Sequence, residues 1–355
     1  MICLRKFWEA LILASLLALA GCRPASNASI VFFGQMPDPD DRTGFIVTNR
    51  TGTTFHFLTN GSFMDGASWS PDAKRIAFTN SNNLYVINAD GSALRKITSQ
   101  LTVFAGKPSW SPDGKNLAFA AFAESGSGQT VQIFRIGDDG SGLKQLTNAS
   151  DPALEPSWSP DGTKIVYTFG SNDTEIYTMS ASDGSSKANL SRDPSALDIS
   201  PSWDRNGFEI LYLRYTPGNQ NERSDLYRMA PDGSSQRVIK SGADRLNVFV
   251  PSYSPDSTKI IFQGMAPRNS DPTYAVRIYT IRPDGTDLQK LIDWGYTPDW
   301  GAGPPIDKTK VKLFSCPPFC TKPQPVPLWD PSALRRTAGS SRLAVPARQP
   351  TGANR

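Results

Sequence analysis

A short aromatic motif recurs along most of the chain at a nearly constant spacing. The sequence Ser-Trp-Ser-Pro-Asp occurs three times without change, and three altered copies follow. The aromatic residues of the six copies are Trp69, Trp110, Trp158, Trp203, Tyr253 and Trp300, which lie 41 to 50 residues apart. A unit of this length, made of strand-like pieces, cannot bury its own apolar faces. The repeat therefore indicates β-units arranged radially around an axis.

Each unit contains four segments with strand character. The strands expected in the first complete unit are, in order, residues 68–70, 75–78, 84–87 and 94–98. Pro71-Asp72 separates the first two strands, and Asp90-Gly91 separates the last two. Proline presets φ for a turn, aspartate bonds its own backbone, and glycine accepts positive φ. Four antiparallel strands joined in this way make one propeller blade.

The two ends of the repeat region determine the number of blades. Residues 29–59 contain the last three strands of a unit but lack its Trp strand, and residues 297–300 form a Trp strand without the other three. Five complete units lie between them. The sequence thus predicts an all-β fold over residues 29–301, a six-bladed β-propeller of four-stranded antiparallel blades. One blade is closed by strands from both ends of the repeat region, which leaves no open edge.

The repeat resembles that of TolB-like β-propellers, the Ser-Trp-Ser-Pro-Asp-Gly variety of WD-like repeats, over residues 29–301. The resemblance implies the propeller fold. Relatives of this kind carry a separate α/β domain ahead of the propeller. We expect no such domain here, because the propeller begins shortly after Cys22. We therefore carry over the fold and not the partner of TolB in the cell envelope.

The N-terminal segment has the features of a lipoprotein signal peptide over residues 1–21. Arg5 and Lys6 precede an apolar stretch that is too short to span a bilayer. The sequence Leu-Ala-Gly-Cys ending at Cys22 is similar to a bacterial lipobox, which implies that Cys22 is acylated. We expect an exported protein anchored in the membrane through this residue, on the periplasmic side or at the cell surface. Residues 22–28 then form a short linker.

The C-terminal segment, residues 302–355, is rich in proline and has little apolar periodicity, which predicts a disordered tail. It contains Cys316 and Cys320. In an exported protein we favour a local disulfide between them over a metal site or a redox dithiol.

The sequence offers little support for catalysis or for a cofactor. His56 is the only histidine and lies within a predicted strand. A histidine-ligated zinc site needs two or three histidines, and neither a Gly-x-Ser-x-Gly motif nor a Gly-rich phosphate loop is present. Asp38, Asp40 and Asp41 are a weak calcium candidate, for which we favour a solvated loop. We expect no cofactor. The net charge of +4, with no basic stripe, argues against nucleic-acid binding.

Length variation among the units falls mainly between the second and third strands. That connection lies on the same face of a propeller as the link from one blade to the next, and variable loops commonly hold function. The longest such loops are residues 121–130, 216–225 and 264–275, and the interblade segments beside them are 101–107, 151–155, 193–199 and 243–250. The candidate ligand-binding residues on these segments are Phe104, Glu155, Asp198, Arg223, Arg245, Phe249, Arg268 and Tyr274. For each residue, covering of a blade edge is an equal alternative.

The functional hypothesis is a monomeric, non-catalytic, lipid-anchored propeller that binds a protein, peptide or glycan at the cell envelope through its loop face. A propeller-type polysaccharide lyase or hydrolase is one alternative. A structural scaffold protein of the envelope is another.

Overall fold

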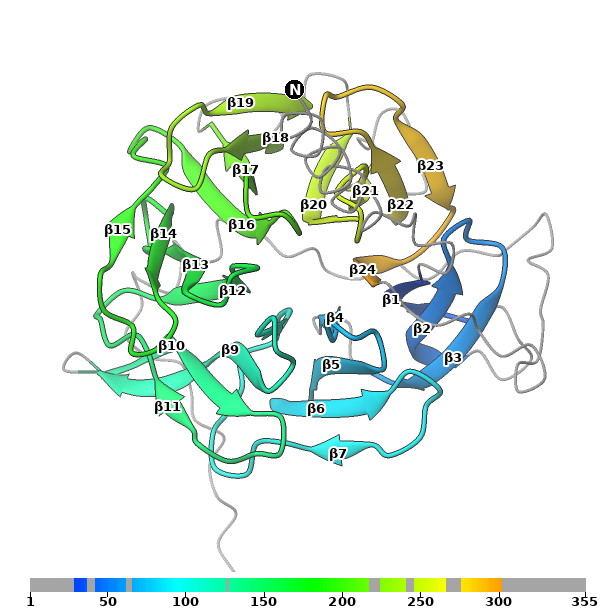
Figure 1. Cartoon of the computed structure of the whole chain (residues 1–355), viewed down its shortest axis with the longest axis horizontal. Helices are drawn as coiled ribbons and strands as arrows, with labels where there is room; N and C mark the ends of the chain where they lie inside the picture. Colours follow the sequence, from blue (N-terminus) through cyan, green and yellow to red (C-terminus); the bar gives the residue numbers. More distant parts are fainter. Residues whose placement is uncertain are drawn as a thin grey trace, which may run out of the picture.

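The chain folds into six four-stranded antiparallel sheets arranged around a central axis, with the first strand of each sheet innermost (Figure 1). The structure is a computed structural model and describes residues 29–36, 42–61, 66–125, 128–216, 224–240, 246–265 and 276–301. Within these ranges every element is a strand. The predicted six-bladed propeller is confirmed.

The blades are numbered from the one that joins the two ends of the described chain. Blade 1 contains β24 (Tyr296–Gly301), β1 (Ser29–Gln35), β2 (Thr43–Asn49) and β3 (Phe55–Asn60); blade 2 contains β4 (Ala67–Trp69), β5 (Arg75–Asn80), β6 (Asn83–Asn88) and β7 (Arg95–Lys96); and blade 3 contains β8 (Ser109–Trp110), β9 (Asn116–Ser125), β10 (Gly128–Gly137) and β11 (Lys144–Gln145). Blade 4 contains β12 (Ala153–Trp158), β13 (Lys164–Phe169), β14 (Glu175–Ser180) and β15 (Ala188–Asn189); blade 5 contains β16 (Leu197–Trp203), β17 (Ile210–Tyr215), β18 (Ser224–Met229) and β19 (Arg237–Lys240); and blade 6 contains β20 (Asn247–Tyr253), β21 (Ile260–Met265), β22 (Val276–Ile281) and β23 (Gln289–Ile292).

The hydrophobic core is divided among the interfaces between neighbouring blades. In β1, Ile30 and Phe32 pack toward blade 6, whereas Val31 and Phe33 pack toward blade 2. Successive residues of a strand point to opposite faces, so a strand buried on both faces reads as a continuous apolar run. The repeated aromatic residue is part of this packing, because Trp69 lies among blade 1 side chains and Trp110 among those of blade 2.

The repeated motif of each unit forms the turn between its first two strands. The Ser70 hydroxyl donates to the Asp72 carboxylate at 2.6 Å and accepts from the Arg75 amide at 3.0 Å. The Lys74 amide donates to the same carboxylate at 3.2 Å. The same bonds recur in blades 3, 4 and 6. In blade 5, Asp204 takes the place of the serine and accepts from the amides of Phe208 and Glu209.

Blade 1 is closed by strands that are far apart in the sequence. Ser29 of β1 pairs with Gly301 of β24, and Ile30 pairs with Trp300. β24 therefore ends, and β1 begins, on the face where the other blades carry their first turn. The predicted split blade is confirmed.

The closing strand β24 carries a buried acid, Asp299, at the position that is serine in the other five blades. Its carboxylate accepts from Lys107 Nζ at 2.7 Å, from the Ser252 hydroxyl at 2.8 Å and from the Trp69 amide at 2.9 Å. Burial opposes its ionisation, but the charges of Lys107 and Arg205 outweigh burial and hold the pKa of Asp299 below its ordinary value. Arg205 also donates to the Trp300 carbonyl at 3.1 Å. Groups from four other blades thus meet at the closing strand.

Candidate functional site: the variable-loop face

The two faces of the propeller differ in their connections. One face, here the tight-turn face, carries the first turns and the Asp-Gly turns. The opposite, variable-loop face carries the links between second and third strands. On it, β5 and β6 are joined by two residues with positive φ, Ser81 and Asn82, whereas residues 266–275 separate β21 from β22. Positive φ at both residues fits the tightest hairpin turns.

Residues 121–130, which we expected to form a loop, are mostly strand. They extend β9 and β10, which pair from Asn116↔Gly137 to Ser125↔Gly128. The expectation of an irregular loop was wrong here, because the residues from Ala121 to Ser125 pair one to one with those from Gln132 to Gly128. This face therefore carries a long hairpin on blade 3 as well as loops.

Four of the six inner strands contain the same backbone irregularity. Residues Glu155, Ser200, Val250 and Thr297 have positive φ values of 45° to 56°, and each lies three residues before the repeated aromatic residue. The pairing register of the inner strand shifts close to each of them. A non-glycine residue in this conformation is strained, most of all a β-branched one such as Val250. The sequence does not reveal this feature, since the four residue types have nothing in common.

Glu155, a predicted ligand-binding residue, joins blade 4 to blade 5. Its carboxylate accepts from the Ser200 amide at 2.7 Å, from the Ser200 hydroxyl at 2.8 Å and from the Thr168 hydroxyl at 2.8 Å. The Glu155 carboxylate therefore links the β-bulges of two neighbouring inner strands. The carboxylate has three donors, so little of its hydrogen-bonding capacity is left for a ligand.

Asp198, another predicted site residue, is fully buried and paired with Arg214. The guanidinium bonds both carboxylate oxygens, at 2.8 and 2.7 Å, in a forked arrangement. Its third nitrogen lies 3.1 Å from Asp193. These bonds raise the pKa of Arg214. Reasoning from the sequence missed this arginine, although an arginine within the apolar run of β17 was the signal for it.

Aromatic rings and polar groups surround this ion pair. The guanidinium of Arg214 lies 4.9 Å from the centre of the Tyr227 ring and 5.5 Å from that of Tyr212. Nearby, Glu175 accepts a hydrogen bond from Ser191, and burial raises the pKa of Glu175. The group forms a buried polar cluster between blades 4 and 5.

The two phenylalanines among the candidates contribute chiefly to packing. Phe104 contacts Phe122 edge to face at 5.9 Å and packs against the core between blades 3 and 4. Phe249 is half-buried in β20, opposite Gln263. No hydrogen bond or ion pair of the described side chains joins any two of Phe104, Glu155, Asp198 and Phe249.

Several predictions concern residues outside the described ranges. They are the candidates Arg223, Arg245, Arg268 and Tyr274, the acidic residues Asp38, Asp40 and Asp41, and the cysteines Cys22, Cys316 and Cys320.

The described residues show no arrangement typical of metal chemistry. Among them, no group of three or more His, Cys, Asp or Glu side chains is placed to hold a metal ion. His56 lies half-buried in β3, as expected, and burial lowers its pKa despite the neighbouring Asp90. No helix in the described part of the chain is long and apolar enough to cross a membrane.

Solved structures with the same architecture come from proteins of differing function. TolB from Acinetobacter baumannii superposes with a TM-score of 0.63 at 20% identity, covering 81% of this chain and 70% of that one. An oligogalacturonate lyase from Vibrio parahaemolyticus superposes with a TM-score of 0.53 at 15% identity, covering 74% of each chain. At these identities the likeness shows the fold alone.

Sequence comparison identifies the family. A TolB homologue from Chlorobium luteolum is 33% identical over 134 residues, which is 37% of this chain and only 28% of that protein's length. The sequence model of the TolB β-propeller domain matches residues 45–245, more than half of the chain. The chain therefore belongs to the TolB β-propeller family.

Proposed function

We propose that the protein is a non-catalytic component of the cell envelope that binds a protein, peptide or glycan through its variable-loop face. The asymmetry between the two faces carries this proposal. The first turns of blades 2, 3, 4 and 6 repeat the same serine–aspartate bonding, whereas the links between second and third strands range from residues 81–82 in blade 2 to residues 266–275 in blade 6. Family membership and a rigid scaffold under non-repeating loops support a recognition role.

The buried clusters beneath this face support the same role. Glu155 ties blade 4 to blade 5, and the Asp198–Arg214 pair lies at the same interface. They hold the inner strands in a fixed arrangement, which reduces the entropy lost when a partner binds. In this proposal Glu155 and Asp198 position the loops, while Arg223, Arg268 and Tyr274 provide the contacts.

A photo-crosslinking amino acid tests which face engages the partner in intact cells. Placed at Tyr274, within the loop between β21 and β22, it is expected to yield a discrete adduct. The control is Leu143, an exposed residue (45%) on the outer edge of blade 3. Equal labelling from both positions, or none from Tyr274, would contradict the assignment of the variable-loop face.

We also propose that Cys22 is acylated and anchors the propeller to a membrane. The support is the lipobox-like sequence ending at Cys22 and the apolar segment before it. The variant Cys22→Ser is expected to move the protein from the membrane fraction to the soluble fraction and to abolish incorporation of labelled palmitate. Retention of Cys22→Ser in the membrane fraction would exclude acylation as the anchor.

A further inference from the structure

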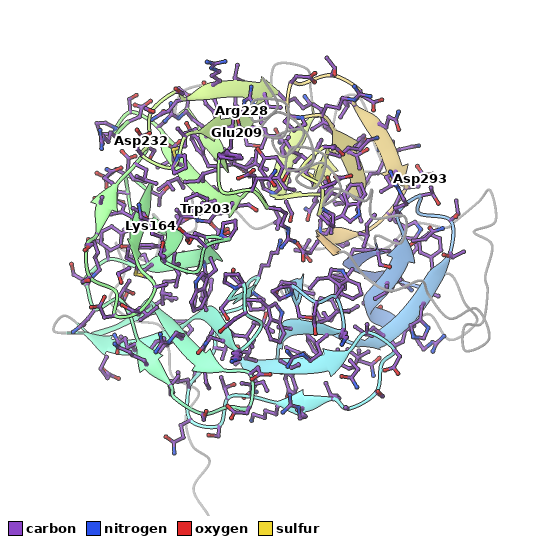
Figure 2. All side chains as sticks on the ribbon, in the orientation of Figure 1. Lys164, Trp203, Glu209, Arg228, Asp232 and Asp293 are labelled. Atoms are coloured by element: carbon purple, nitrogen blue, oxygen red, sulfur yellow. The ribbon has the colours of Figure 1, made fainter. Side chains whose placement is uncertain are left out.

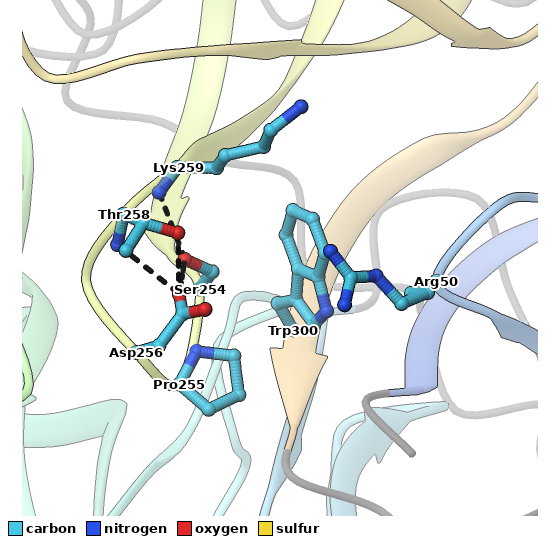
Figure 3. A pocket seen from close by; sticks show the side chains of 7 residues that line it. All are labelled: Arg50, Ser254, Pro255, Asp256, Thr258, Lys259 and Trp300. Carbon is cyan, nitrogen blue, oxygen red and sulfur yellow. Dashed lines mark hydrogen bonds between the residues drawn. The ribbon is translucent and has the colours of Figure 1, made fainter. Parts of the chain in front are cut away.

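A small depression opens on the tight-turn face between blade 6 and blade 1. Trp300 of the closing strand lies in it, between Arg50 and the turn from Ser254 to Lys259 (Figure 3). This is the face opposite the variable loops, so the inference below does not depend on the proposed function.

The depression lies where blade 1 lacks a first turn. In the other blades a turn joins the first strand to the second, and in blade 4 its Gly162 carbonyl accepts from Trp158 Nε1 at 3.1 Å. In blade 1 the first two strands come from opposite ends of the chain and are not joined by a turn. Trp300 is only 3% exposed, and its Nε1 has no hydrogen-bond partner in the described structure. The indole nitrogens of Trp69 and Trp203 also lack a hydrogen-bond partner in the described structure, so an unpaired indole nitrogen is not by itself evidence of a binding site.

A comparison of equivalent interfaces shows a reversal of charge. Between blades 2 and 3, Arg75 lies 4.8 Å from the centre of the Trp110 ring and forms a close ion pair with Asp138. The equivalent of Arg75 in blade 6 is Lys259, six residues after the repeated aromatic residue. The equivalent of Asp138 in blade 1 is Arg50, the first residue after the third strand. Two cations, Lys259 and Arg50, thus occupy the positions that form an ion pair between blades 2 and 3.

At the interface between blades 5 and 6, the acidic side chain also pairs with a basic side chain of the protein. There Glu209 takes the position of Lys259, pairs with Arg228 at 2.7 Å and accepts from the Tyr253 hydroxyl at 3.0 Å (Figure 2). Acid and base again balance within the protein. The interface of blade 6 with blade 1 differs from both, because two cations, Arg50 and Lys259, line the same depression as Trp300.

Acids near the depression are already engaged. The Oδ2 atom of Asp287 lies 3.3 Å from Lys259 Nζ and 3.5 Å from Arg282 Nε, so one carboxylate pairs with two cations. Asp256 accepts from the Ser254 hydroxyl and from Thr258 within its turn. Arg50 is exposed and has no hydrogen-bond or ion-pair partner among the described residues. The Trp300 ring lies beside its guanidinium and lines the same depression (Figure 3).

We propose that this depression binds a side-chain carboxylate from an acidic segment of a partner protein. The carboxylate takes the place that Asp138 occupies between blades 2 and 3. Arg50 offers forked donors that match a carboxylate, and Lys259 adds positive potential. The protein thus has a second recognition site, on the face away from the variable loops.

The indole N–H resonance of Trp300 reports on this site directly by NMR. The chain has 8 tryptophans, and the variant Trp300→Tyr assigns the signal, because tyrosine holds the equivalent position in blade 6. The probes are an end-capped triglutamate peptide, a capped trilysine peptide and inorganic phosphate. The variants are Arg50→Ala and Arg50→Asp, the latter recreating the acid–base pair found between blades 2 and 3. Arg237→Ala, at an exposed arginine on β19, is the matched control.

Triglutamate is expected to shift the Trp300 resonance with an affinity in the millimolar range, and trilysine is not. Affinity should fall roughly tenfold in Arg50→Ala, which corresponds to the loss of one charge-assisted bond. It should vanish in Arg50→Asp and stay unchanged in Arg237→Ala. An unshifted resonance with triglutamate, or equal affinity for Arg50→Ala and the unmodified protein, would overturn the proposal. A response to phosphate without a response to triglutamate would also overturn it.

Discussion

At the scale of single residues, buried charge is the most consequential feature of the molecule. Asp198 is fully buried, and Arg214 satisfies both of its oxygens while stacking near two tyrosines. Such a pair contributes little net stability relative to well-packed apolar residues, but loss of one partner leaves an uncompensated charge. The cluster therefore constrains how blades 4 and 5 meet more than it stabilises the fold.

Replacement of Arg214 tests this view. Arg214→Met is expected to lower the free energy of unfolding by about 3–5 kcal/mol, because it leaves the Asp198 carboxylate buried without a partner. Arg214→Lys should restore little, since lysine cannot make the forked contact. The double variant Asp198→Asn, Arg214→Met should be more stable than Arg214→Met alone. Urea denaturation followed by fluorescence measures these three variants and the single variant Asp198→Asn, and additive effects of Asp198→Asn and Arg214→Met would contradict the coupling.

The charged residues show how much of the candidate site could be predicted from the sequence at this scale. Asp198 and Glu155 were predicted as ligand-binding residues, and the structure places both in hydrogen-bonded clusters of the protein itself. Their surroundings were not predictable, because Ser200 becomes the partner of Glu155 only when strands of different blades meet, and Arg214 comes opposite Asp198 only in the register that β16 and β17 adopt. A polar residue in a loop-like segment has the same appearance in the sequence whether it faces solvent or holds two blades together.

At the scale of the strand, the recurrent bulges are the main departure from regular structure. They place Glu155, Ser200, Val250 and Thr297 in the left-handed region, although none of them is glycine or asparagine. A bulge re-aims the side chains of a strand and increases its twist. The recurrence at one position indicates that closure of the ring imposes the bulge on the inner strand and that the local sequence tolerates it.

Relief of this strain should be measurable at Val250. Val250→Asn is expected to raise the free energy of unfolding by about 1 kcal/mol, because asparagine enters the left-handed region at lower cost than a β-branched residue. The control is Val238→Asn at an exposed strand position without positive φ, where no gain is expected. A destabilised Val250→Asn in chemical denaturation would show that packing of the valine outweighs the strain.

The blade itself was almost fully predictable from its turns. Pro71-Asp72 and Asp90-Gly91 determine where the strands of blade 2 end, and the structure places turns at both. The hairpin of β9 and β10 was not recognised, although Gly126-Ser127, the dipeptide between the two strands in the sequence, is one of the pairs that mark a tight hairpin turn. The inner strands β12, β16, β20 and β24 are also longer than the motif suggests, because their first residues pair with the second strand before the bulge.

At the scale of the whole molecule, closure depends on one acid. Asp299 lies where the other blades have serine and collects bonds from blades 2, 3 and 6. Asp299→Ala is expected to cost about 3–5 kcal/mol, because Lys107 then remains without its partner and the Trp69 amide without an acceptor. Asp299→Ser, which restores the residue of the other blades, should recover part of this loss. Calorimetric unfolding of both variants measures the difference, and equal melting temperatures for Asp299→Ala and the unmodified protein would contradict the role of this acid in closure.

The stability of the ring should also depend on pH in a defined window. Hydrogen bonds from Ser185 hold the pKa of Asp183 at about 2, and the bond from Ser111 lowers the pKa of Asp113 in the same way. A depressed carboxyl pKa contributes stability that is complete above the ordinary value of 3.8 and is lost as pH falls toward 2. Asp299 acts in the same direction.

The free energy of unfolding is therefore expected to fall as the pH is lowered from about 4 to about 2. Urea denaturation at a series of pH values measures the slope. The variant Ser185→Ala should flatten it, because the Asp183 pKa then moves toward its ordinary value. Constant stability across this interval would show that the turn carboxylates titrate alike in the folded and unfolded chain.

The pairing of Ser29 with Gly301 has a mechanical consequence. The two chain segments that leave the propeller do so side by side, so tension between them acts on the same end of the β24–β1 ladder. Hydrogen bonds loaded in this geometry break one after another instead of sharing the force. Pulling apart these two segments should open the ring along that seam while the other blades remain folded. A pull on opposite ends of two paired strands would instead have to shear their whole ladder at once.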